Sequence, residues 1–351
     1  MSNKFGFVIP DLWVQCPWPA IFHPNGAAIE AESDRWILSH CPNNQASLLR
    51  ILPSLRSGAL AAFCYNNCSD ERFRLVCDFI AVLFLLDDIT DELDTMDNDL
   101  FRDIITNALI DPTSYRPGMT NGKEHPAEEP DASRVVRDLW TRICAVTGLP
   151  VQQRIMKGLQ EYFGAVRLQA ERRSSGEIPS WEVYIEHRRL SSACRPLFAL
   201  AEAGLGIELP EEVVEHPLMA KMRNYTNDWV AISNDIFSFR FEYARNDDHN
   251  LIAVMMKKYN LDIQSAVDRV ADICGDALSK YLEAKAQFPS YGPEVDAQIQ
   301  SFLHILQSWM SGNLAWSFVT PRYLGEKRLE IKEHRWVDLS EETLKEIRVE
   351  A

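Results

Sequence analysis

The stretch from Asp70 to Glu92 constrains the fold more than any other part of this 351-residue chain. It contains no glycine or proline, and its second half is apolar on most faces. This pattern predicts a long helix that is buried on nearly all sides, and such a helix needs other helices around it. A second stretch of the same character runs from Pro217 to Ala244. The sequence therefore favours an all-α protein built around at least two buried helices.

Helical periodicity recurs along the rest of the chain, whereas strand patterns bounded by turns are scarce. A polar, acidic segment with several prolines and glycines interrupts it between Asp111 and Asp131, and could mark a domain boundary. Because the helical pattern continues on both sides without a change in composition, we instead predict a single domain over residues 1–351, with a flexible acidic surface loop near 111–131. Further helices are expected at 46–52, 100–110, 133–146, 151–171, 179–204, 263–285, 294–318 and 341–349.

The composition argues against several classes of protein. A net charge of −15 disfavours nucleic-acid binding, which needs a basic surface. The first residues lack the apolar core of a signal peptide. The longest apolar run, Phe79 to Leu86, is far shorter than the roughly 20 residues that span a bilayer. The eight cysteines have no disulfide-framework spacing. We therefore expect a cytoplasmic protein without a membrane span or a nucleic-acid partner, present as a monomer or homodimer.

An acidic run follows the apolar part of the first buried helix. Asp87 and Asp91 are one helical turn apart and share a face, and Asp88 lies beside them. Like charges at this spacing repel, and a helix C-terminus disfavours anions, so the run costs stability unless a cation neutralises it. Hard divalent cations such as Mg²⁺ prefer carboxylate oxygens. A solvated acidic helix end is the alternative, but the apolar run ending at Leu86 places Asp87 at the rim of the core.

A stripe of three polar residues marks the second buried helix. Asn234, Ser238 and Glu242 follow one another at intervals of four, so that an amide, a hydroxyl and a carboxylate project from one side. This set suits a hard metal ion whose other ligands are water and phosphate. A polar outer stripe is the alternative, but the neighbouring residues include an isoleucine and three phenylalanines, Ile236, Phe237, Phe239 and Phe241. Together the two motifs predict metal ions held between facing helices.

Both motifs resemble those of class I terpene synthases, in particular the fungal sesquiterpene synthases. The family's DDxxD motif is matched by residues 87–91 and its NDxxSxxxE motif by residues 234–242. Two further family elements occur at the family's spacing, a diphosphate-sensing arginine, here Arg188, and an Arg-Tyr pair, here Arg322 and Tyr323. The resemblance extends over roughly residues 60–324.

This resemblance implies a class I terpene synthase α-helical bundle with the active-site cavity between helices. It implies a site for Mg²⁺, typically three ions for which Mn²⁺ can substitute, with the ligands Asp87, Asp88, Asp91, Asn234, Ser238 and Glu242. The implied diphosphate-binding residues, which join Asp87 in catalysis, are Arg188, Arg322 and Tyr323. The implied substrate pocket includes Phe84, Ser192 and Trp316. The backbone around Ser192 is expected to break the helix and to direct a carbonyl at the developing cation.

Three positions depart from the family pattern. Ser191 stands where aspartate, asparagine or threonine is commoner, Ser192 where related sequences often have glycine, and Phe241 where some have lysine. The predicted activity is that of a lyase: Mg²⁺-dependent ionisation of farnesyl diphosphate, release of diphosphate, and cyclisation of the carbocation to a sesquiterpene hydrocarbon or alcohol. One alternative is a chain-elongating prenyltransferase, which would need a second aspartate-rich motif. Another is a non-catalytic helical binding protein with a vestigial metal site, against which the intact ligand sets argue.

The excess of acidic residues gathers at and just after the predicted metal site. Asp87 to Asp99 holds seven acidic residues and no basic one, and residues 111–131 add five acidic residues against two basic ones. This field would repel an anionic substrate without metal and attract it once cations are bound. We therefore expect diphosphate binding to require the divalent cation.

Overall fold

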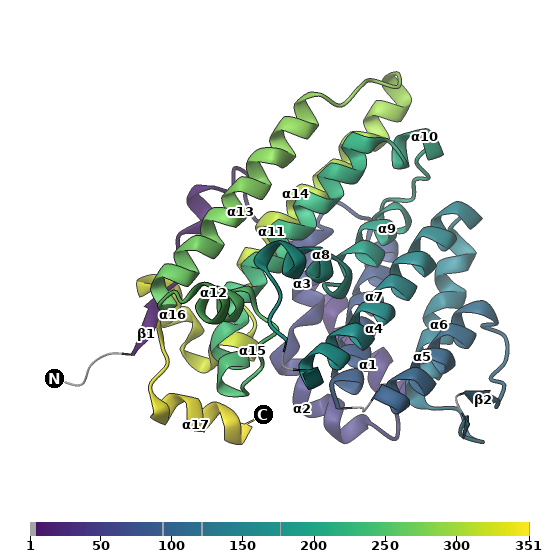
Figure 1. Cartoon of the computed structure of the whole chain (residues 1–351). Helices are drawn as coiled ribbons and strands as arrows, with labels where there is room; N and C mark the ends of the chain where they lie inside the picture. Colours follow the sequence, from purple (N-terminus) through teal and green to yellow (C-terminus); the bar gives the residue numbers. More distant parts are fainter. Residues whose placement is uncertain (1–4, 93–94, 121, 176, 351) are drawn as a thin grey trace.

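The structure is a computed structural model that describes residues 5–92, 95–120, 122–175 and 177–350, and the side chains next to these gaps, that of Asp91 included, lie outside the description. It is an all-α bundle, as predicted (Figure 1). The α-helices are α1 (Gly26–His40), α2 (Gln45–Leu55), α3 (Ser57–Cys64), α4 (Asp70–Glu92), α5 (Thr95–Ile110), α6 (Asp131–Val146), α7 (Leu149–Ser175), α8 (Trp181–Ser191), α9 (Cys194–Leu205), α10 (Glu211–Val214), α11 (Pro217–Ala244), α12 (Leu251–Tyr259), α13 (Ile263–Ala286), α14 (Pro293–Ser317), α15 (Pro321–Leu324), α16 (Arg328–His334) and α17 (Glu341–Glu350). Two 3₁₀ turns, η1 (Leu12–Val14) and η2 (Gly325–Lys327), accompany them.

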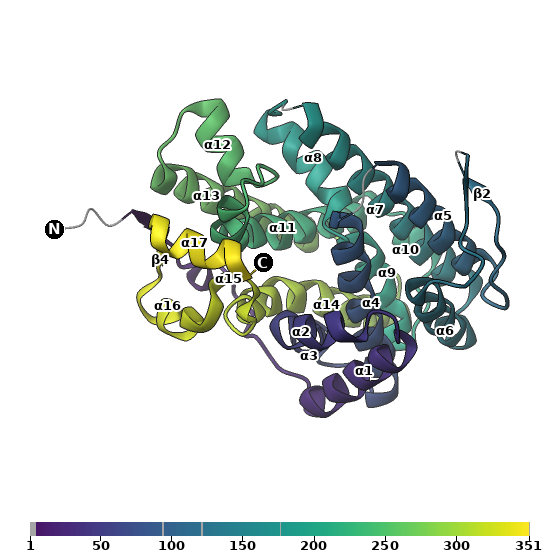
Figure 2. The ribbon, with the colours of Figure 1, turned by 90° about the horizontal axis from the view of Figure 1, so that it is seen from below.

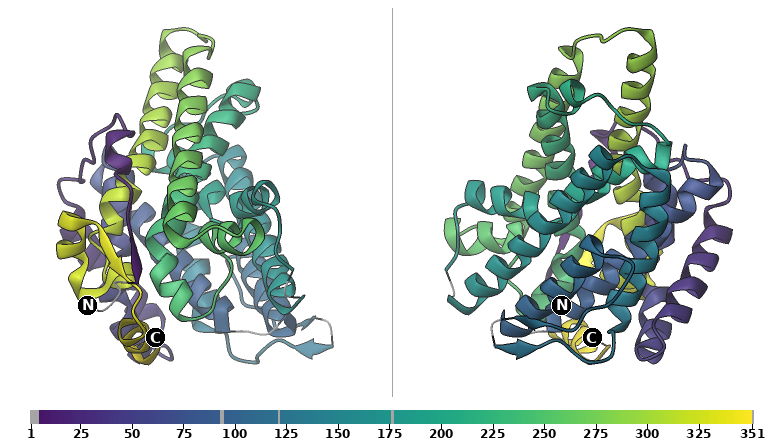
Figure 3. Two further views of the ribbon diagram at one scale, coloured as in Figure 1. Left: turned by 60° about the vertical axis from the view of Figure 1, so that its left-hand side comes forward. Right: turned by 90° about the vertical axis from the view of Figure 1, so that its right-hand side faces the viewer.

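The two predicted central helices, α4 and α11, have the bounds expected from the sequence, and they organise two halves of the bundle. Helix α4 packs against α1, α3, α6 and α9, whereas α11 packs against α13 and α14. Helix α14 also contacts α3 and α9, which joins the halves. The turn between α13 and α14 forms the top of the molecule in both views of Figure 3. Within the described ranges, every helix is too short or too polar to cross a bilayer.

Two short antiparallel sheets lie on opposite sides of the bundle (Figure 2). Strand β1 (Gly6–Val8) pairs with β4 (Trp336–Asp338), which ties the two ends of the chain together. Strands β2 (Met119–Thr120) and β3 (Lys123–Glu124) form a hairpin inside the acidic segment 111–131. The predicted flexibility of that segment, and the single-domain organisation, stay predictions.

Helix α11 is held at both ends by interactions with neighbouring residues. The His216 side chain accepts a hydrogen bond from the Leu218 N–H at 3.1 Å, and Pro217 occupies the first turn. At the other end, Arg348 of α17 donates to the Ala244 carbonyl at 2.7 Å, satisfying one of the carbonyls that a helix leaves unpaired. The C-terminal part of α11 is therefore anchored.

The predicted continuous helix over 179–204 is wrong, because the chain breaks it into α8 and α9. Ala193 adopts a left-handed conformation with φ of 57°, which is unfavourable for a residue with a Cβ. Helix α11 supplies a polar support for this break. Ser192 Oγ donates to Asn227 Oδ1 at 2.7 Å, and Asn227 Nδ2 donates to the Arg189 carbonyl at 2.8 Å. The break at Ser192 that the family resemblance implied is confirmed.

Candidate active site

A cavity of about 410 Å³ lies between the two halves of the bundle, a size typical of small-molecule sites. On α4 the apolar lining residue Phe84 precedes Asp87 by one turn, and on α11 Val230 precedes Asn234 by one turn. Both helices therefore change from apolar to polar toward their C-terminal ends. Further apolar walls come from α3, α9 and α14 through Leu60, Leu197, Trp309 and Trp316.

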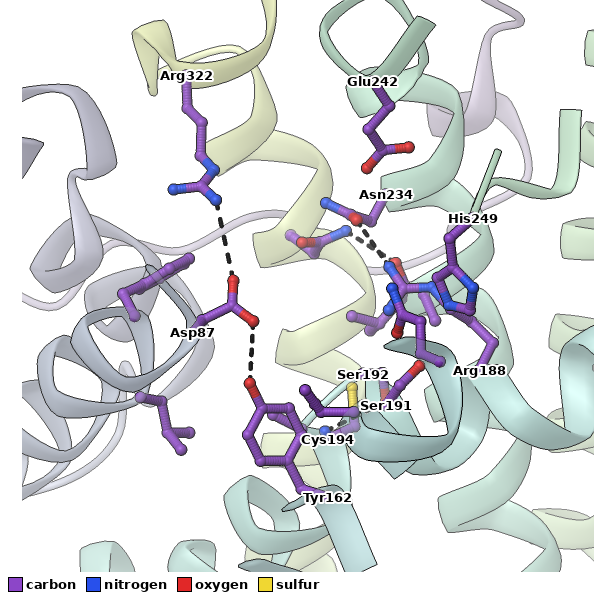
Figure 4. Close-up of a pocket in the computed structure, with 18 of the residues that line it drawn as sticks. Asp87, Tyr162, Arg188, Ser191, Ser192, Cys194, Asn234, Glu242, His249 and Arg322 are labelled. Carbon is purple, nitrogen blue, oxygen red and sulfur yellow. Dashed lines mark hydrogen bonds and ion pairs between the residues drawn. The ribbon is translucent and has the colours of Figure 1, made fainter. Parts of the chain in front are cut away.

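On the α4 side of the cavity, Asp87 is part of the lining and lies between two donors (Figure 4). Tyr162 of α7 donates its hydroxyl to Asp87 Oδ1 at 2.9 Å, and Arg322 Nη2 lies 3.9 Å from Asp87 Oδ2. Arg322 Nη1 also donates to Asp88 Oδ1 at 3.4 Å. Burial opposes the charge of Arg322, but the neighbouring Tyr323 and the two aspartates raise its pKa above the ordinary value. Arg322 thus stays charged.

The Arg-Tyr pair sits on the short helix α15, whose position is fixed by the corner between α2 and α3. Thr320 accepts a hydrogen bond from the Arg322 N–H at 3.2 Å and donates its hydroxyl to the Ser54 carbonyl at 2.6 Å. Trp316 donates its indole N–H to the carbonyl of Arg56 at 2.9 Å, at the same corner. This support could not be predicted from the sequence, because it joins residues more than 250 positions apart.

Three aromatic rings and one guanidinium form a connected cluster beside the α4 carboxylates. Trp316 lies 5.9 Å from Phe84 and 5.6 Å from Tyr323, measured between ring centroids. The Arg322 guanidinium lies 5.8 Å from the Phe84 ring centroid. Since ring faces attract cations, this wall suits a ligand that carries an anionic group at one end and develops positive charge on a hydrocarbon.

The α11 side of the cavity is a buried hydrogen-bonded network. Arg188 of α8 donates to Asp235 Oδ1 at 3.1 Å and to Asn234 Oδ1 at 3.0 Å. Asn234 in turn donates to the Tyr323 hydroxyl at 2.8 Å. The fully buried Asp235 also accepts from the Tyr184 hydroxyl at 2.7 Å. Hydrogen bonds therefore fix the side chains of Arg188, Asn234 and Tyr323 relative to one another. Arg322, the other residue of the Arg-Tyr pair, directly precedes Tyr323 in the chain.

Asn250 and Tyr184 are supporting residues that sequence reasoning missed. Asn250 donates through the same nitrogen to the Asp235 carbonyl at 2.7 Å and to Glu242 Oε2 at 2.8 Å. Core packing is the role that the sequence favours for Tyr184, which is not among the predicted site residues. Its spacing of four from Arg188 puts both on one face of α8, which is the signal that could have found it.

The acids on α11 titrate abnormally. Burial, together with the nearby Asp235, raises the pKa of Glu242 to about 8, against the opposing effect of the Asn250 hydrogen bond. Burial also raises the pKa of Asp235, although Arg188 and the Tyr184 hydroxyl work in the opposite direction. The carboxylates outnumber the cations on this side, so the charged forms are incompletely compensated.

Comparison with known proteins agrees with this geometry. Residues 78–280 match the family model of terpene synthase family 2, C-terminal metal binding. The chain is 42% identical to sesquiterpene synthase Agr3 of Cyclocybe aegerita over 96% of this chain and 95% of that protein, and 40% identical to alpha-muurolene synthase of Coprinopsis cinerea over 96% of this chain and 79% of that protein.

The chain belongs to the terpene synthase family. Its fold is also that of the linalool/nerolidol synthase from Streptomyces clavuligerus, solved in complex with 2-fluorogeranyl diphosphate, with a TM-score of 0.74 and 23% identity over 88% of this chain and 99% of that one. The resemblance to class I terpene synthases and to the fungal sesquiterpene synthases is confirmed, and the protein is a terpene synthase enzyme.

The α11 stripe of this terpene synthase fits a divalent metal ion. Ser238 is buried, and its hydroxyl has no hydrogen-bond partner among the described residues. An unpaired buried hydroxyl costs about 1–3 kcal/mol, which a bound cation would offset. Burial raises the pKa of Glu242 although Arg188 works in the opposite direction, so the charged carboxylate is incompletely compensated. Amide, hydroxyl and carboxylate oxygens are the donors that such ions prefer.

Most of the site residues predicted from the sequence meet at this cavity. The lining includes Phe84, Asp87, Arg188, Ser192, Asn234, Glu242, Trp316, Arg322 and Tyr323. Asp88 is brought to Arg322, and Ser238 lies on α11 between Asn234 and Glu242. The side chain of Asp91 lies outside the described residues. The roles assigned to these residues in metal and diphosphate binding stay predictions.

Proposed function

We propose that this terpene synthase ionises farnesyl diphosphate with the help of Mg²⁺, releases diphosphate and cyclises the carbocation to a sesquiterpene hydrocarbon or alcohol. The observation that carries the proposal is the cavity itself, whose lining combines Asp87 of α4 and the α11 residues Asn234 and Glu242 with the aromatic side chains of Phe84 and Trp316. Relatives that bear the name sesquiterpene synthase support the C15 substrate.

The metal ions belong between Asp87 and Asp88 on one side and Asn234, Ser238 and Glu242 on the other. When bound they supply Lewis-acid stabilisation of the leaving diphosphate. Three ions, with Mn²⁺ as a substitute for Mg²⁺, are part of the proposal.

Arg188, Arg322 and Tyr323 bind the diphosphate oxygens in this proposal. Each guanidinium is already oriented by carboxylates, Arg188 by Asp235 and Arg322 by Asp87 and Asp88. Preset donors of this kind lose little energy to reorganisation when charge develops on the leaving group. The planar arginine side chain can donate two parallel hydrogen bonds to phosphate oxygens.

The apolar and aromatic side chains of the cavity contact the hydrocarbon part of the substrate in this proposal. Phe84 and Trp316 line the cavity, and the face of an aromatic ring stabilises a nearby cation by about 0.5–2 kcal/mol. The buried surroundings exclude bulk water from the reactive intermediate. The helix break at Ser192 brings backbone polar groups to the same cavity.

Product analysis tests this function. The purified protein is incubated with farnesyl diphosphate with Mg²⁺, with Mn²⁺, or with a chelator, and the extracted volatiles are analysed by gas chromatography and mass spectrometry. We expect cyclised C15 products with either ion and none with the chelator. The absence of terpene products from farnesyl, geranyl and geranylgeranyl diphosphates would overturn the proposal. Formation of a longer prenyl diphosphate with isopentenyl diphosphate would instead identify a chain-elongating enzyme.

A further inference from the structure

Arg245 differs from the other arginines that line the cavity. Arg188 and Arg322 both form ion pairs with aspartates. The Arg245 side chain makes no hydrogen bond or ion pair with any residue in the described parts of the chain. Its guanidinium carbon lies instead 5.1 Å from the centroid of the Phe241 ring. The Arg245 guanidinium therefore lines the cavity without a bound carboxylate among the described residues.

The backbone holds Arg245 at this position. It directly follows α11, and its N–H donates to the Glu242 carbonyl at 3.0 Å. Arg348 binds the preceding carbonyl, that of Ala244. Phe241 is one helical turn earlier, and both side chains line the cavity close to Glu242. The side chain is exposed, which places its charge toward the opening of the cavity rather than in its interior.

A ring contact orients a guanidinium without neutralising it, whereas an ion pair with a carboxylate does both. Binding an anion through Arg188 or Arg322 means sharing these groups with aspartates. Arg245 has no such partner to give up, and its planar donors suit phosphate oxygens.

We propose that Arg245 is a third arginine of the diphosphate site, which binds phosphate oxygens at the cavity opening while the Phe241 ring holds its guanidinium in place. The inference rests on the proposed function, since it assigns a further residue to the same diphosphate. Because the interaction exists before and after ionisation, it contributes to binding more than to the chemical step.

The test uses inorganic pyrophosphate with Mg²⁺, titrated into the protein in a calorimeter. Arg245→Gln should weaken pyrophosphate binding about tenfold, the amount expected for one charge-assisted hydrogen bond. Arg245→Lys, which keeps the charge but loses the planar fork, should fall between this variant and the native protein. In turnover assays with farnesyl diphosphate, Arg245→Gln should raise KM by a similar factor and change kcat little.

Lys221→Gln is the matched control, because it removes one positive charge from an exposed position near the start of the same helix. It should bind pyrophosphate like the native protein. Equal affinities for Arg245→Gln, Lys221→Gln and the native chain would overturn the assignment of Arg245 while leaving the proposed function in place. If the native chain neither binds pyrophosphate with Mg²⁺ nor converts farnesyl diphosphate, the proposed function fails, and this inference fails with it.

Discussion

The two sides of the cavity differ in how their acidic side chains are stabilised. On α4 the side chains of Asp87 and Asp88 are 40% and 27% exposed. Their negative charges are therefore stabilised both by solvent and by the ion pairs with Arg322. On α11 the motif residue Asp235 is fully buried, and it accepts three hydrogen bonds from the neighbouring helices α8 and α12. The α11 side is therefore part of the folded core, whereas the α4 side can lose charge without loss of the fold. Substitutions should separate stability from activity accordingly.

The largest effect is expected from Asp235→Ala. This change leaves Arg188 buried without its carboxylate and removes the acceptor of the Tyr184 hydroxyl. Breaking a buried ion pair in this way costs about 3–5 kcal/mol in the free energy of unfolding, which denaturant titration measures. The matched change on the other side, Asp88→Ala, should cost about 1 kcal/mol or less. Equal losses for the two variants would remove the distinction between the sides.

Asp87→Asn should affect activity instead of stability. The amide keeps the shape of the side chain but loses the negative charge proposed to hold metal. We expect kcat with farnesyl diphosphate to fall by about a hundredfold or more, in the range seen when one electrostatic contribution to a transition state is removed. The melting temperature should stay close to that of the native protein. An unchanged kcat would exclude Asp87 from the metal site.

A smaller effect is expected from Tyr162→Phe, which tests whether the Tyr162 hydroxyl orients the Asp87 carboxylate. The change removes the hydrogen bond to Asp87 Oδ1, worth about 1 kcal/mol, and leaves the buried ring. The Mg²⁺ concentration for half-maximal turnover should rise roughly fivefold, and excess Mg²⁺ should restore the rate.

Tyr281→Phe is the control for this experiment. Tyr281 is also a buried tyrosine whose hydroxyl is hydrogen-bonded, in this case to Gln307, and it does not line the cavity. The Mg²⁺ dependence of this variant should match the native one. A uniform rate loss in Tyr162→Phe that Mg²⁺ does not rescue would show that the tyrosine has no part in orienting Asp87.

The smallest effect concerns pH in the metal-free protein. The pKa of Glu242 is raised to about 8 in the folded state, so its contribution to stability is complete below the ordinary carboxyl pKa and is lost as the pH rises through about 8. In a chelator the melting temperature should therefore fall by a few degrees between pH 6 and pH 9. Glu242→Gln should flatten this dependence, and an identical slope in this variant would assign it to another group.

The sequence predicted the main helices and the two motifs because both are periodic. Helices α4 and α11 have long apolar runs with clear ends, and the polar groups of each motif recur at helical spacing. Helices α1, α3 and α12 were missed, as were the short helices α10, α15 and α16. Helix α3 begins Ser-Gly, which reads as a turn, yet Gly58 is needed there because a Cβ would lie 2.5 Å from Glu30.

Supporting contacts between distant segments could not be predicted in the same way. Tyr162 meets Asp87 and Asn234 meets Tyr323 across separations of 75 and 89 residues, which only the packing of the helices decides. The break between α8 and α9 was hidden from the helical pattern, because no glycine or proline marks it between residues 188 and 195. Its polar support from Asn227 comes from another helix.

A crystal structure with Mn²⁺ and pyrophosphate tests most directly whether the two sides form one metal-dependent diphosphate site. Anomalous scattering locates the bound Mn²⁺ ions directly. The account predicts Mn²⁺ peaks both at Asp87 and at Asn234, Ser238 and Glu242, with pyrophosphate bridging them and contacting Arg188 and Arg322. Pyrophosphate bound by the arginines without Mn²⁺, or Mn²⁺ away from both motifs, would contradict it.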